Sequence, residues 1–451
     1  MANGHADLAP SGAKKWMTCA GAPAMEAGEP NATSKYSAEG TVAHFIAALC
    51  LTDRVSASKY AGVEVGVWDA GAGFTGPANL IPPLFTFTVD DDMVGFVQEY
   101  VDKVMEYVGI EGIAFFEQRM PISDITGEAN AFGTGDAIIL RPGELQAHDL
   151  KYGMGIRVSP VENEQEMIYA LAALPLYEKY RKTCSLGELK TIRLVIHQPR
   201  LNSFPEWSCT LAELLAFGEK VKDAAKVSLE LLEVGANVLG GEEVVYQHLV
   251  PGNHCGDCFC KAQATCPALA KKVQDEVGAD FEALAATKVT PEEALSIQTE
   301  GQCSQAGNKT LGTKMDAIPM IESWCKAVRA KVESELFLGR PVQGYKLVKG
   351  RKGRRSWNDA TLVDEMLKKM RLKEAERYKQ TLKSPTQIEE LLKTGTVGGI
   401  QWKKIQAHVT QAEGSPSVAE ASDPREAIVI PSPDADFGAV TTDDDFADMV
   451  G

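Results

Sequence analysis

The chain has 451 residues, enough for two or three domains, and its hydrophobic content of 44% supports a sizeable core. It contains no apolar run of the length that a transmembrane helix requires. Residues 1–16 also lack the apolar segment of a secretory signal peptide, so we expect a cytoplasmic protein with no membrane association. The net charge of −16 does not exclude a DNA-binding protein, because residues 411–451 hold ten acids against one base and contribute about −9 of it.

The first elements in the chain are two predicted helices and a strand. Residues 34–51 have the pattern of a capped apolar helix, and residues 90–108 form an amphipathic helix with acids in its first turn. Between them, residues 55–88 are rich in Gly and Pro and are predicted to be a loop. Residues 113–122 follow as a strand with Glu117 at its centre, and Glu117 is a weak candidate for a site residue.

A hairpin is predicted within residues 132–153. The apolar run at 137–140 and the alternating run at 145–148 have the length of strands, and Pro142-Gly143 between them is a turn signal. If the hairpin is symmetric about this turn, residues that face each other have numbers that add up to 285. Asp136 and Asp149 meet this condition.

The hairpin therefore predicts a cation site. Asp136 and Asp149 would lie about 5 Å apart at Cβ, and Lys151 would share their face of the sheet. Two opposed carboxylates repel each other unless a positive charge lies between them, and Mg²⁺ or Mn²⁺ binds such oxygen ligands. The Lys151 ammonium could orient a water molecule or stabilise negative charge in a transition state.

These residues resemble the core motif of the PD-(D/E)XK nucleases, Gly-x-x-Asp followed by Asp-x-Lys. The RecB-like branch of that superfamily adds a His on an upstream helix and a Gln-x-x-x-Tyr helix downstream. His44 lies on the predicted helix 34–51, and Gln165 and Tyr169 lie on a predicted helix at 161–181. The resemblance covers about residues 8–270 and is closest to phage-encoded RecB-like exonucleases that carry an iron–sulfur cluster.

The resemblance implies an α/β fold with a restriction-endonuclease-like core, a central mixed sheet flanked by helices. It implies a metal-dependent deoxyribonuclease, most simply an exonuclease of phage recombination or replication in an infected or lysogenic bacterium. The metal would be held by Asp136, Asp149 and the carbonyl of Leu150, and His44 would complete or tune the site. Lys151 would position the attacking water, and Gln165 and Tyr169 would hold the DNA strand.

After the predicted helix 161–181, the chain continues with a strand at 191–198 and a long amphipathic helix at 211–239. A cysteine cluster follows, with four cysteines within twelve positions: Cys255, Cys258, Cys260 and Cys266. Such clustering indicates a metal site.

In the family that the chain resembles, one upstream cysteine and three downstream cysteines hold a [4Fe–4S] cluster. Cys19 fits the upstream position. The chain departs from the pattern, because it has four downstream cysteines where three are expected. The expected set is Cys19, Cys255, Cys258 and Cys266, with Cys260 as the substitute for Cys258. A zinc site that uses the four downstream cysteines is the alternative.

Residues 291–297 and 320–336 are predicted to be helical. The segment 344–357 then carries six bases and no acid: Lys346, Lys349, Arg351, Lys352, Arg354 and Arg355. Such a segment could contact DNA phosphates, and a solvated basic loop is the equally simple alternative.

We expect three parts: a RecB-like core with the cysteine cluster at 1–275, a helical and basic domain at 276–410, and a disordered acidic tail at 411–451. Helices are expected at 360–392. DNA is the expected partner, a phage single-strand-binding or annealing protein is a further one, and an oligomer is possible. A non-catalytic DNA-binding or scaffold protein with the nuclease fold is the alternative function.

Overall fold

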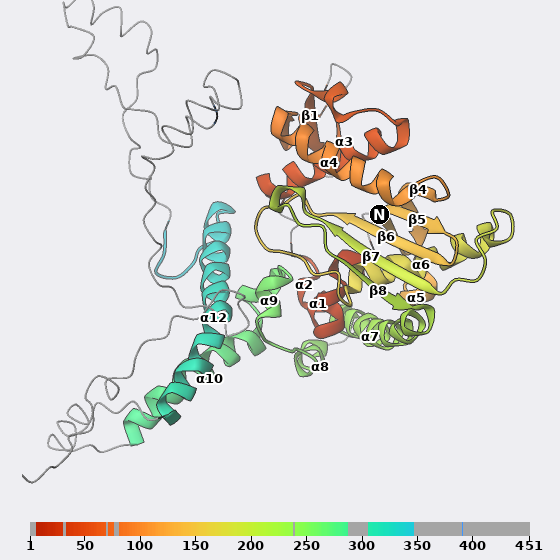
Figure 1. Cartoon of the computed structure of the whole chain (residues 1–451). Helices are drawn as coiled ribbons and strands as arrows, with labels where there is room; N and C mark the ends of the chain where they lie inside the picture. Colours follow the sequence, from red (N-terminus) through yellow and green to blue (C-terminus); the bar gives the residue numbers. More distant parts are fainter. Residues whose placement is uncertain are drawn as a thin grey trace, which may run out of the picture. The chain divides into compact units, whose positions relative to one another are not determined.

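A computed structural model describes residues 6–29, 33–68, 71–75, 81–237, 240–286 and 305–346, together with Glu390 (Figure 1). The chain divides into two compact units, Met1–Val348 and Lys349–Gly451, and all described residues except Glu390 belong to the first. The helix that spans Pro267–Ala286 runs across residue 275, where we had placed a domain boundary. None of the helices in the described parts is both long and apolar enough to cross a membrane.

A five-stranded mixed sheet forms the centre of the first unit, in the order β4-β5-β6-β7-β8. Only the β6–β7 pair is parallel. The strands are β4 (Ile113–Pro121), β5 (Phe132–Arg141), β6 (Glu144–Leu150), β7 (Thr191–His197) and β8 (Glu206–Thr210). The strand β8 had not been predicted.

The hairpin β5–β6 has the register predicted from its turn. Its pairs run from Arg141–Glu144 to Ala137–His148, and the two numbers in each pair add up to 285. Gly143 has a φ of 75°, in the left-handed region that glycine adopts without strain, which explains why the turn needs a glycine. The short turn leaves the two strands no other register.

Helices cover both faces of the sheet, so the alternating side chains of β5 enter two cores. Ala137 and Ile139 pack with α3 (Lys35–Asp53) and α4 (Asp91–Val108), whereas Ile138 and Leu140 pack with α6 (Glu164–Arg181) and α7 (Leu211–Asn237). Figure 1 shows α3 and α4 on one side of the sheet and α6 and α7 on the other. Because both faces are covered, the strands read as apolar runs rather than as a simple alternation.

The helices predicted at 34–51, 90–108 and 211–239 agree with the structure, and capping residues fix the starts of the first two. Ser34 accepts a hydrogen bond from the backbone N–H of Ser37 at the start of α3, and Asp90 does the same for Met93 in α4. The helix predicted at 161–181 begins later, because Asn163 is its N-cap. The helix predicted at 320–336 is part of a longer helix that begins at Gln305.

The prediction of a loop at 55–88 is wrong. The segment contains a 3₁₀ turn and a three-stranded antiparallel sheet in the order β2-β1-β3: η2 (Ala57–Tyr60), β1 (Glu64–Trp68), β2 (Gly71–Phe74) and β3 (Phe85–Thr88). Val65 and Val67 are buried in the core beneath α3 and α4. Gly66, Gly71 and Gly73 lie within the sheet, and a Cβ at Gly66 would stand 2.5 Å from the ring of Trp68.

The remaining elements are helices, and most of them are short. They are η1 (Pro10–Gly12), α1 (Ala13–Thr18), α2 (Ala22–Glu26), α5 (Ser123–Thr126), η3 (Pro199–Leu201), α8 (Gly241–Gln247), α9 (His254–Asp257), η4 (Lys261–Ala264), α10 (Pro267–Ala286) and α12 (Gln305–Phe337). The C-terminal part of the unit is thus helical, as expected. The predicted features at 291–297, 360–392 and 411–451 lie outside the described residues.

Candidate metal centre and cysteine pocket

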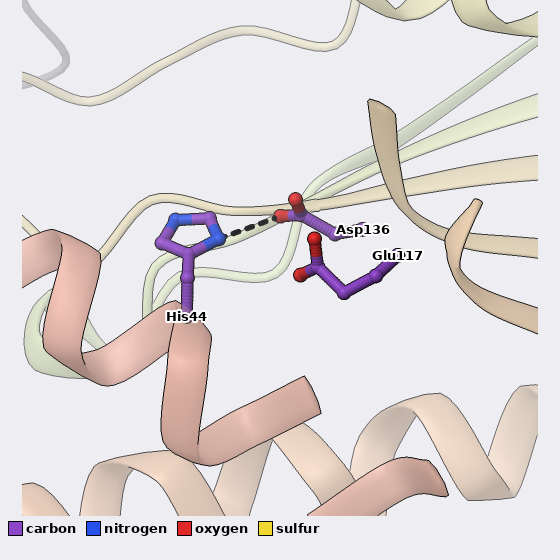
Figure 2. Close-up of side chains that lie close together, drawn as sticks. All are labelled: His44, Glu117 and Asp136. Carbon is purple, nitrogen blue, oxygen red and sulfur yellow. Dashed lines mark ion pairs between the residues drawn. The ribbon is translucent and has the colours of Figure 1, made fainter. Parts of the chain in front are cut away.

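Three side chains from three separate elements meet at one edge of the hairpin. The imidazole of His44 on α3, the carboxylate of Glu117 on β4 and the carboxylate of Asp136 on β5 each offer a ligand atom, and these atoms lie within 4.8 Å of one another. His44 Nδ1 is 3.2 Å from Asp136 Oδ2, and Figure 2 shows Glu117 turned toward this pair. One nitrogen and two carboxylate oxygens are a ligand set for a divalent cation.

Asp136 is held in place by the strand that pairs with its own. Its Oδ2 accepts a hydrogen bond of 2.8 Å from the backbone N–H of Leu150, at the end of β6. Burial alone would raise the pKa of Asp136, but His44, this N–H group and Lys151 together lower it below its ordinary value. Asp136 is therefore an anion at neutral pH.

Glu117 joins the site through an unusual backbone conformation. Its φ is 47°, although the pairs on either side, Phe116–Ala137 and Gln118–Gly135, keep one register. A non-glycine residue in the left-handed region is strained, and such strain collects at functional sites. The residue is exposed at the edge of the sheet, but its carboxylate faces the pair, and partial burial with the charge of Asp136 raises its pKa to about 7.

The proton held by His44 would compete with a bound cation. Burial would lower the pKa of His44, but the charge and hydrogen bond of Asp136 raise it to about 9, so the imidazole carries a proton at neutral pH. A metal ion binds only the neutral imidazole, so binding would release that proton and would strengthen as the pH rises toward 9.

Asp149, Lys151 and Gln165 form a second group beside the trio. Lys151 Nζ lies 2.9 Å from Asp149 Oδ2 and donates to Gln165 Oε1 at 3.0 Å, while Gln165 Nε2 donates to Asp149 Oδ1 at 3.1 Å. Burial would lower the pKa of Lys151, but Asp149 raises it above its ordinary value. The lysine is therefore a fixed cation, and the glutamine holds it against the carboxylate.

Tyr169 is buried one helical turn beyond Gln165. Its ring lies against Gly133, where a Cβ would stand 2.9 Å from Tyr169 Cε1 and from Pro10 Cγ. Gly133 is the glycine of the Gly-x-x-Asp motif. A glycine is required there because the N-terminal segment and α6 pack closely against it. Burial raises the pKa of Tyr169, so its hydroxyl stays protonated and can donate a hydrogen bond.

His148, which precedes Asp149, belongs to the opposite face of the sheet. Its Nδ1 lies 2.9 Å from His197 Nε2, and its Nε2 lies 3.0 Å from Gln146 Oε1. Burial lowers the pKa of His148 well below its ordinary value and that of His197 to about 3, so both stay neutral. This pair is part of the core and not of the metal centre.

Glu166 is a site residue that the sequence pattern did not reveal. Its side chain is 1% exposed, and neither carboxylate oxygen has a hydrogen-bond partner among the described residues. Burial and the charge of Asp149 raise its pKa well above the ordinary value, and the charge of Lys151 partly opposes this. The sequence feature that could have identified Glu166 is a glutamate at the position where the apolar face of α6 begins.

We predict that Glu166→Met stabilises the metal-free protein more at pH 8 than at pH 5. The raised pKa means that ionisation destabilises the folded state, so this penalty grows as the pH rises above about 4, the value for an unfolded chain. The difference between the two pH values should be roughly 1–3 kcal/mol in the free energy of unfolding. Urea denaturation in EDTA measures it.

The control for this change is Glu164→Met, at a half-buried position in the first turn of the same helix. It should give the same small change at both pH values. An effect of Glu166→Met that does not depend on pH would show that the fold does not raise the pKa of this carboxyl above its value in the unfolded chain.

Four cysteines line one pocket at the other end of the unit. Cys19, Cys255, Cys260 and Cys266 surround it with apolar side chains such as Met25 and Leu269. Cys19 follows α1, Cys255 lies in α9, and Cys260 and Cys266 precede η4 and α10. The pocket thus joins the N-terminal segment to the end of the core.

Cys258, which belongs to the ligand set expected from the sequence, does not line this pocket, whereas its substitute Cys260 does. Burial raises the pKa of the Cys258 thiol, and the charges of Lys14 and Lys15 oppose this. Cys260 is turned inward because the chain bends at Phe259, which has a φ of 49°, and because Glu26 accepts a hydrogen bond of 2.7 Å from the backbone N–H of Lys261. Glu26 also binds Lys15 at 2.7 Å, which fixes the loop to α1.

The spacing of these sulfur atoms bears on which group could bind. Tetrahedral zinc with bonds of about 2.3 Å brings its sulfur ligands to about 3.8 Å from one another. In the described parts of the chain, no three cysteine sulfurs lie within 4.8 Å of one another. Burial raises the pKa of Cys19 and Cys255, and that of Cys260 to about 12, so these thiols would need a cationic group to become thiolates.

Of the predicted DNA-binding bases, only Lys346 is described, and it is exposed. The other five, Lys349, Arg351, Lys352, Arg354 and Arg355, lie outside the described residues.

No solved structure matches this chain. The DUF2800 family, described as a protein of unknown function, matches residues 5–426. Because the match spans most of the sequence, the chain belongs to the DUF2800 family.

Proposed function

We propose that the protein is a metal-dependent deoxyribonuclease of the PD-(D/E)XK superfamily, in its RecB-like exonuclease branch. One observation carries this proposal: a cation site of His44, Glu117 and Asp136 lies beside a lysine held between Asp149 and Gln165. The residues of this site lie on the helix α3, on or directly after the antiparallel strands β4, β5 and β6, and on the following helix α6. This is the chain order of that superfamily. A phage enzyme of recombination or replication is the biological role that we infer from the resemblance.

The ligands fit Mg²⁺ or Mn²⁺. Asp136 is anionic, Glu117 ionises near neutral pH, and His44 becomes neutral when its proton is released. Asp149 and the carbonyl of Leu150 remain predicted ligands. A divalent cation, when bound, neutralises these carboxylates and makes a nearby water molecule more acidic, which supplies a nucleophile for phosphodiester hydrolysis.

The residues of the chain itself supply positioning and charge. Lys151 stays protonated, so it acts as a hydrogen-bond donor and a fixed cation and not as the base. It can orient a water molecule and stabilise the negative charge that builds up on the phosphate oxygens. Gln165 accepts a hydrogen bond from the ammonium and so fixes its position. The contact of Tyr169 with a DNA strand is what the resemblance implies.

The cysteine pocket supports an iron–sulfur cluster, with Cys19, Cys255, Cys260 and Cys266 as its ligands. A [4Fe–4S] cluster spreads its four thiolates over different iron atoms, so it needs wider sulfur spacing than zinc does. Its role would be structural. Trp16, between η1 and Cys19, is 1% exposed and packs in the same core as Met167 and Tyr169 of α6, so a group that fixes Cys19 also fixes the helix of Gln165.

The experiment is degradation of linear single- and double-stranded DNA by the purified protein with Mg²⁺, with Mn²⁺ and with EDTA. We expect degradation that requires a metal ion and returns when metal is added back after EDTA. The product ladder also separates exonuclease from endonuclease action and gives the polarity. A protein that binds DNA but does not degrade it with any metal would instead be a non-catalytic DNA-binding protein.

A further inference from the structure

The loop between β6 and α6 exposes apolar side chains next to the proposed centre. It follows Lys151 directly and ends at the helix that carries Gln165. At its tip, Met154 is 60% exposed and Ile156 is 73% exposed. Such side chains lose the stabilisation that burial would give them, so two together at the edge of a site indicate a binding role.

The loop is anchored at both ends, so its tip is held outward. Gln198, buried at the end of β7, accepts a hydrogen bond of 2.9 Å from Val158 N–H and donates one of 2.9 Å to the carbonyl of Ile156. At the other end, Tyr152 is 4% exposed and lies beneath the guanidinium of Arg200. A Cβ at Gly153 or Gly155 would meet no heavy atom within 4 Å, so open space surrounds the tip.

The same anchor connects the loop to the start of α3. Arg200, whose guanidinium carbon is 4.8 Å from the centre of the Tyr152 ring, also pairs with Glu39 at 3.3 Å. One turn earlier on α3, Tyr36 is 85% exposed, and Lys35 beside it is also exposed. The edge of the site therefore presents an aromatic ring, two aliphatic side chains and cationic groups.

This composition matches an unpaired nucleic-acid strand. Aromatic rings stack on bases, aliphatic side chains of Met and Ile insert between base steps, and cationic side chains such as Arg157 and Lys35 attract phosphates. Arg157 is the only charged residue between Tyr152 and Val161. A peptide partner would bring its own charges, and this stretch offers no acid to pair with a basic one.

The position of the loop also favours the substrate over another protein. Met154 is three residues from Lys151, so their Cα atoms are at most about 11 Å apart. At about 3.4 Å per stacked nucleotide, that distance is on the order of three bases from the phosphate that Lys151 would contact.

We propose that residues 153–157 and Tyr36 form a lip that receives the unpaired bases of the strand entering the centre. The lip makes strands with a single-stranded or frayed end the preferred substrate. This inference rests on the proposed nuclease function for its substrate, but its test can succeed or fail separately.

The test compares the wild type with Met154→Ser/Ile156→Ser. The matched control is Ile110→Ser/Leu338→Ser, which removes two other exposed aliphatic side chains of similar size, 103% and 62% exposed. Each protein is titrated into a single-stranded oligonucleotide and, separately, into a duplex, both labelled with 2-aminopurine at one end. The buffer contains Ca²⁺ in place of Mg²⁺ so that DNA can bind without being hydrolysed. The fluorescence of 2-aminopurine then reports binding and the unstacking of the end base.

We expect the lip variant to bind the single strand about tenfold more weakly and to lose the rise in 2-aminopurine fluorescence. The control should match the wild type. With Mg²⁺, the loss of rate on DNA should exceed by at least about fivefold the loss on thymidine 5′-p-nitrophenyl phosphate, which has no second base to engage the lip.

The proposal would be overturned if the lip variant bound the single strand as tightly as the wild type, or if its hydrolysis rate fell equally on DNA and on the small diester. It would also be overturned if the wild type and the control were oligomers and the lip variant a monomer, because a second copy of the chain would then be the occupant of the lip. If the wild type hydrolyses neither substrate but shows the fluorescence change, and the lip variant lacks it, the lip stands and the nuclease function falls.

Discussion

Replacing Asp136 with Asn is expected to slow metal-dependent DNA hydrolysis by about 10³-fold or more. Asp136 is the carboxylate that His44 contacts at 3.2 Å and that the backbone N–H of Leu150 fixes at 2.8 Å. The amide that replaces it has no charge and one acceptor oxygen fewer, so the site loses most of its attraction for a divalent cation. The measurement is the single-turnover rate of hydrolysis with saturating metal.

The same variant should change the protons that accompany metal binding. At pH 7.5 the wild type should release about one proton, mainly from His44, whose pKa of about 9 depends on Asp136. An uncharged amide in place of the carboxylate removes the main cause of that high pKa, so Asp136→Asn should release fewer protons. Calorimetric titration with Mn²⁺ in buffers of different ionisation enthalpy measures the difference.

The control is Asp124→Asn, which changes an exposed acid on α5 away from the site. It should leave rate and metal affinity unchanged. If Asp136→Asn kept the wild-type rate and metal affinity, the centre would not lie at His44, Glu117 and Asp136.

The second large effect concerns the cysteines. Cys260→Ser should remove the proposed iron–sulfur cluster and lower the free energy of unfolding by several kcal/mol, because the binding energy of a structural metal group is folding energy. Cys258→Ser should keep the cluster, because Cys258 does not line the pocket. The two positions differ by two residues, so each serves as the control for the other.

Iron and acid-labile sulfide content, together with thermal unfolding, measure this difference. Iron loss in Cys258→Ser but not in Cys260→Ser would restore the ligand set first expected from spacing. Zinc without iron in the wild type would rule out the cluster. A cluster-free variant that remained fully stable and active would show that the group does not hold the N-terminal segment in place.

The sequence predicts the main hairpin well because its register depends on local chemistry. A two-residue turn with a glycine at φ 75° permits only one register, and the observed register up to Ala137–His148 is the one that predicts the opposition of Asp136 and Asp149. His44 was found through the motif of the family that the chain resembles. The starts of α3 and α4 could also be predicted, because their capping residues are a local feature of the sequence.

Other features depend on long-range contacts that no local pattern contains. Glu117 reaches the site through a left-handed backbone conformation within β4, and an ordinary strand would have been expected there. The choice of Cys260 over Cys258 depends on a bend at Phe259 and on Glu26, more than 200 positions earlier. In the segment 55–88, the glycine count hid short strands whose alternation, as in Phe85–Thr88, was present in the sequence.

The most direct measurement of the central claim is degradation of end-labelled linear DNA by the wild type beside Lys151→Ala, with Mg²⁺ and with EDTA. DNA binding is measured in parallel with Ca²⁺, and circular dichroism checks the fold. We expect the variant to bind DNA but to degrade it at least about 10²-fold more slowly, because it lacks the cation that Asp149 and Gln165 hold. Degradation by the variant at the wild-type rate would mean that the activity belongs to another site or another protein.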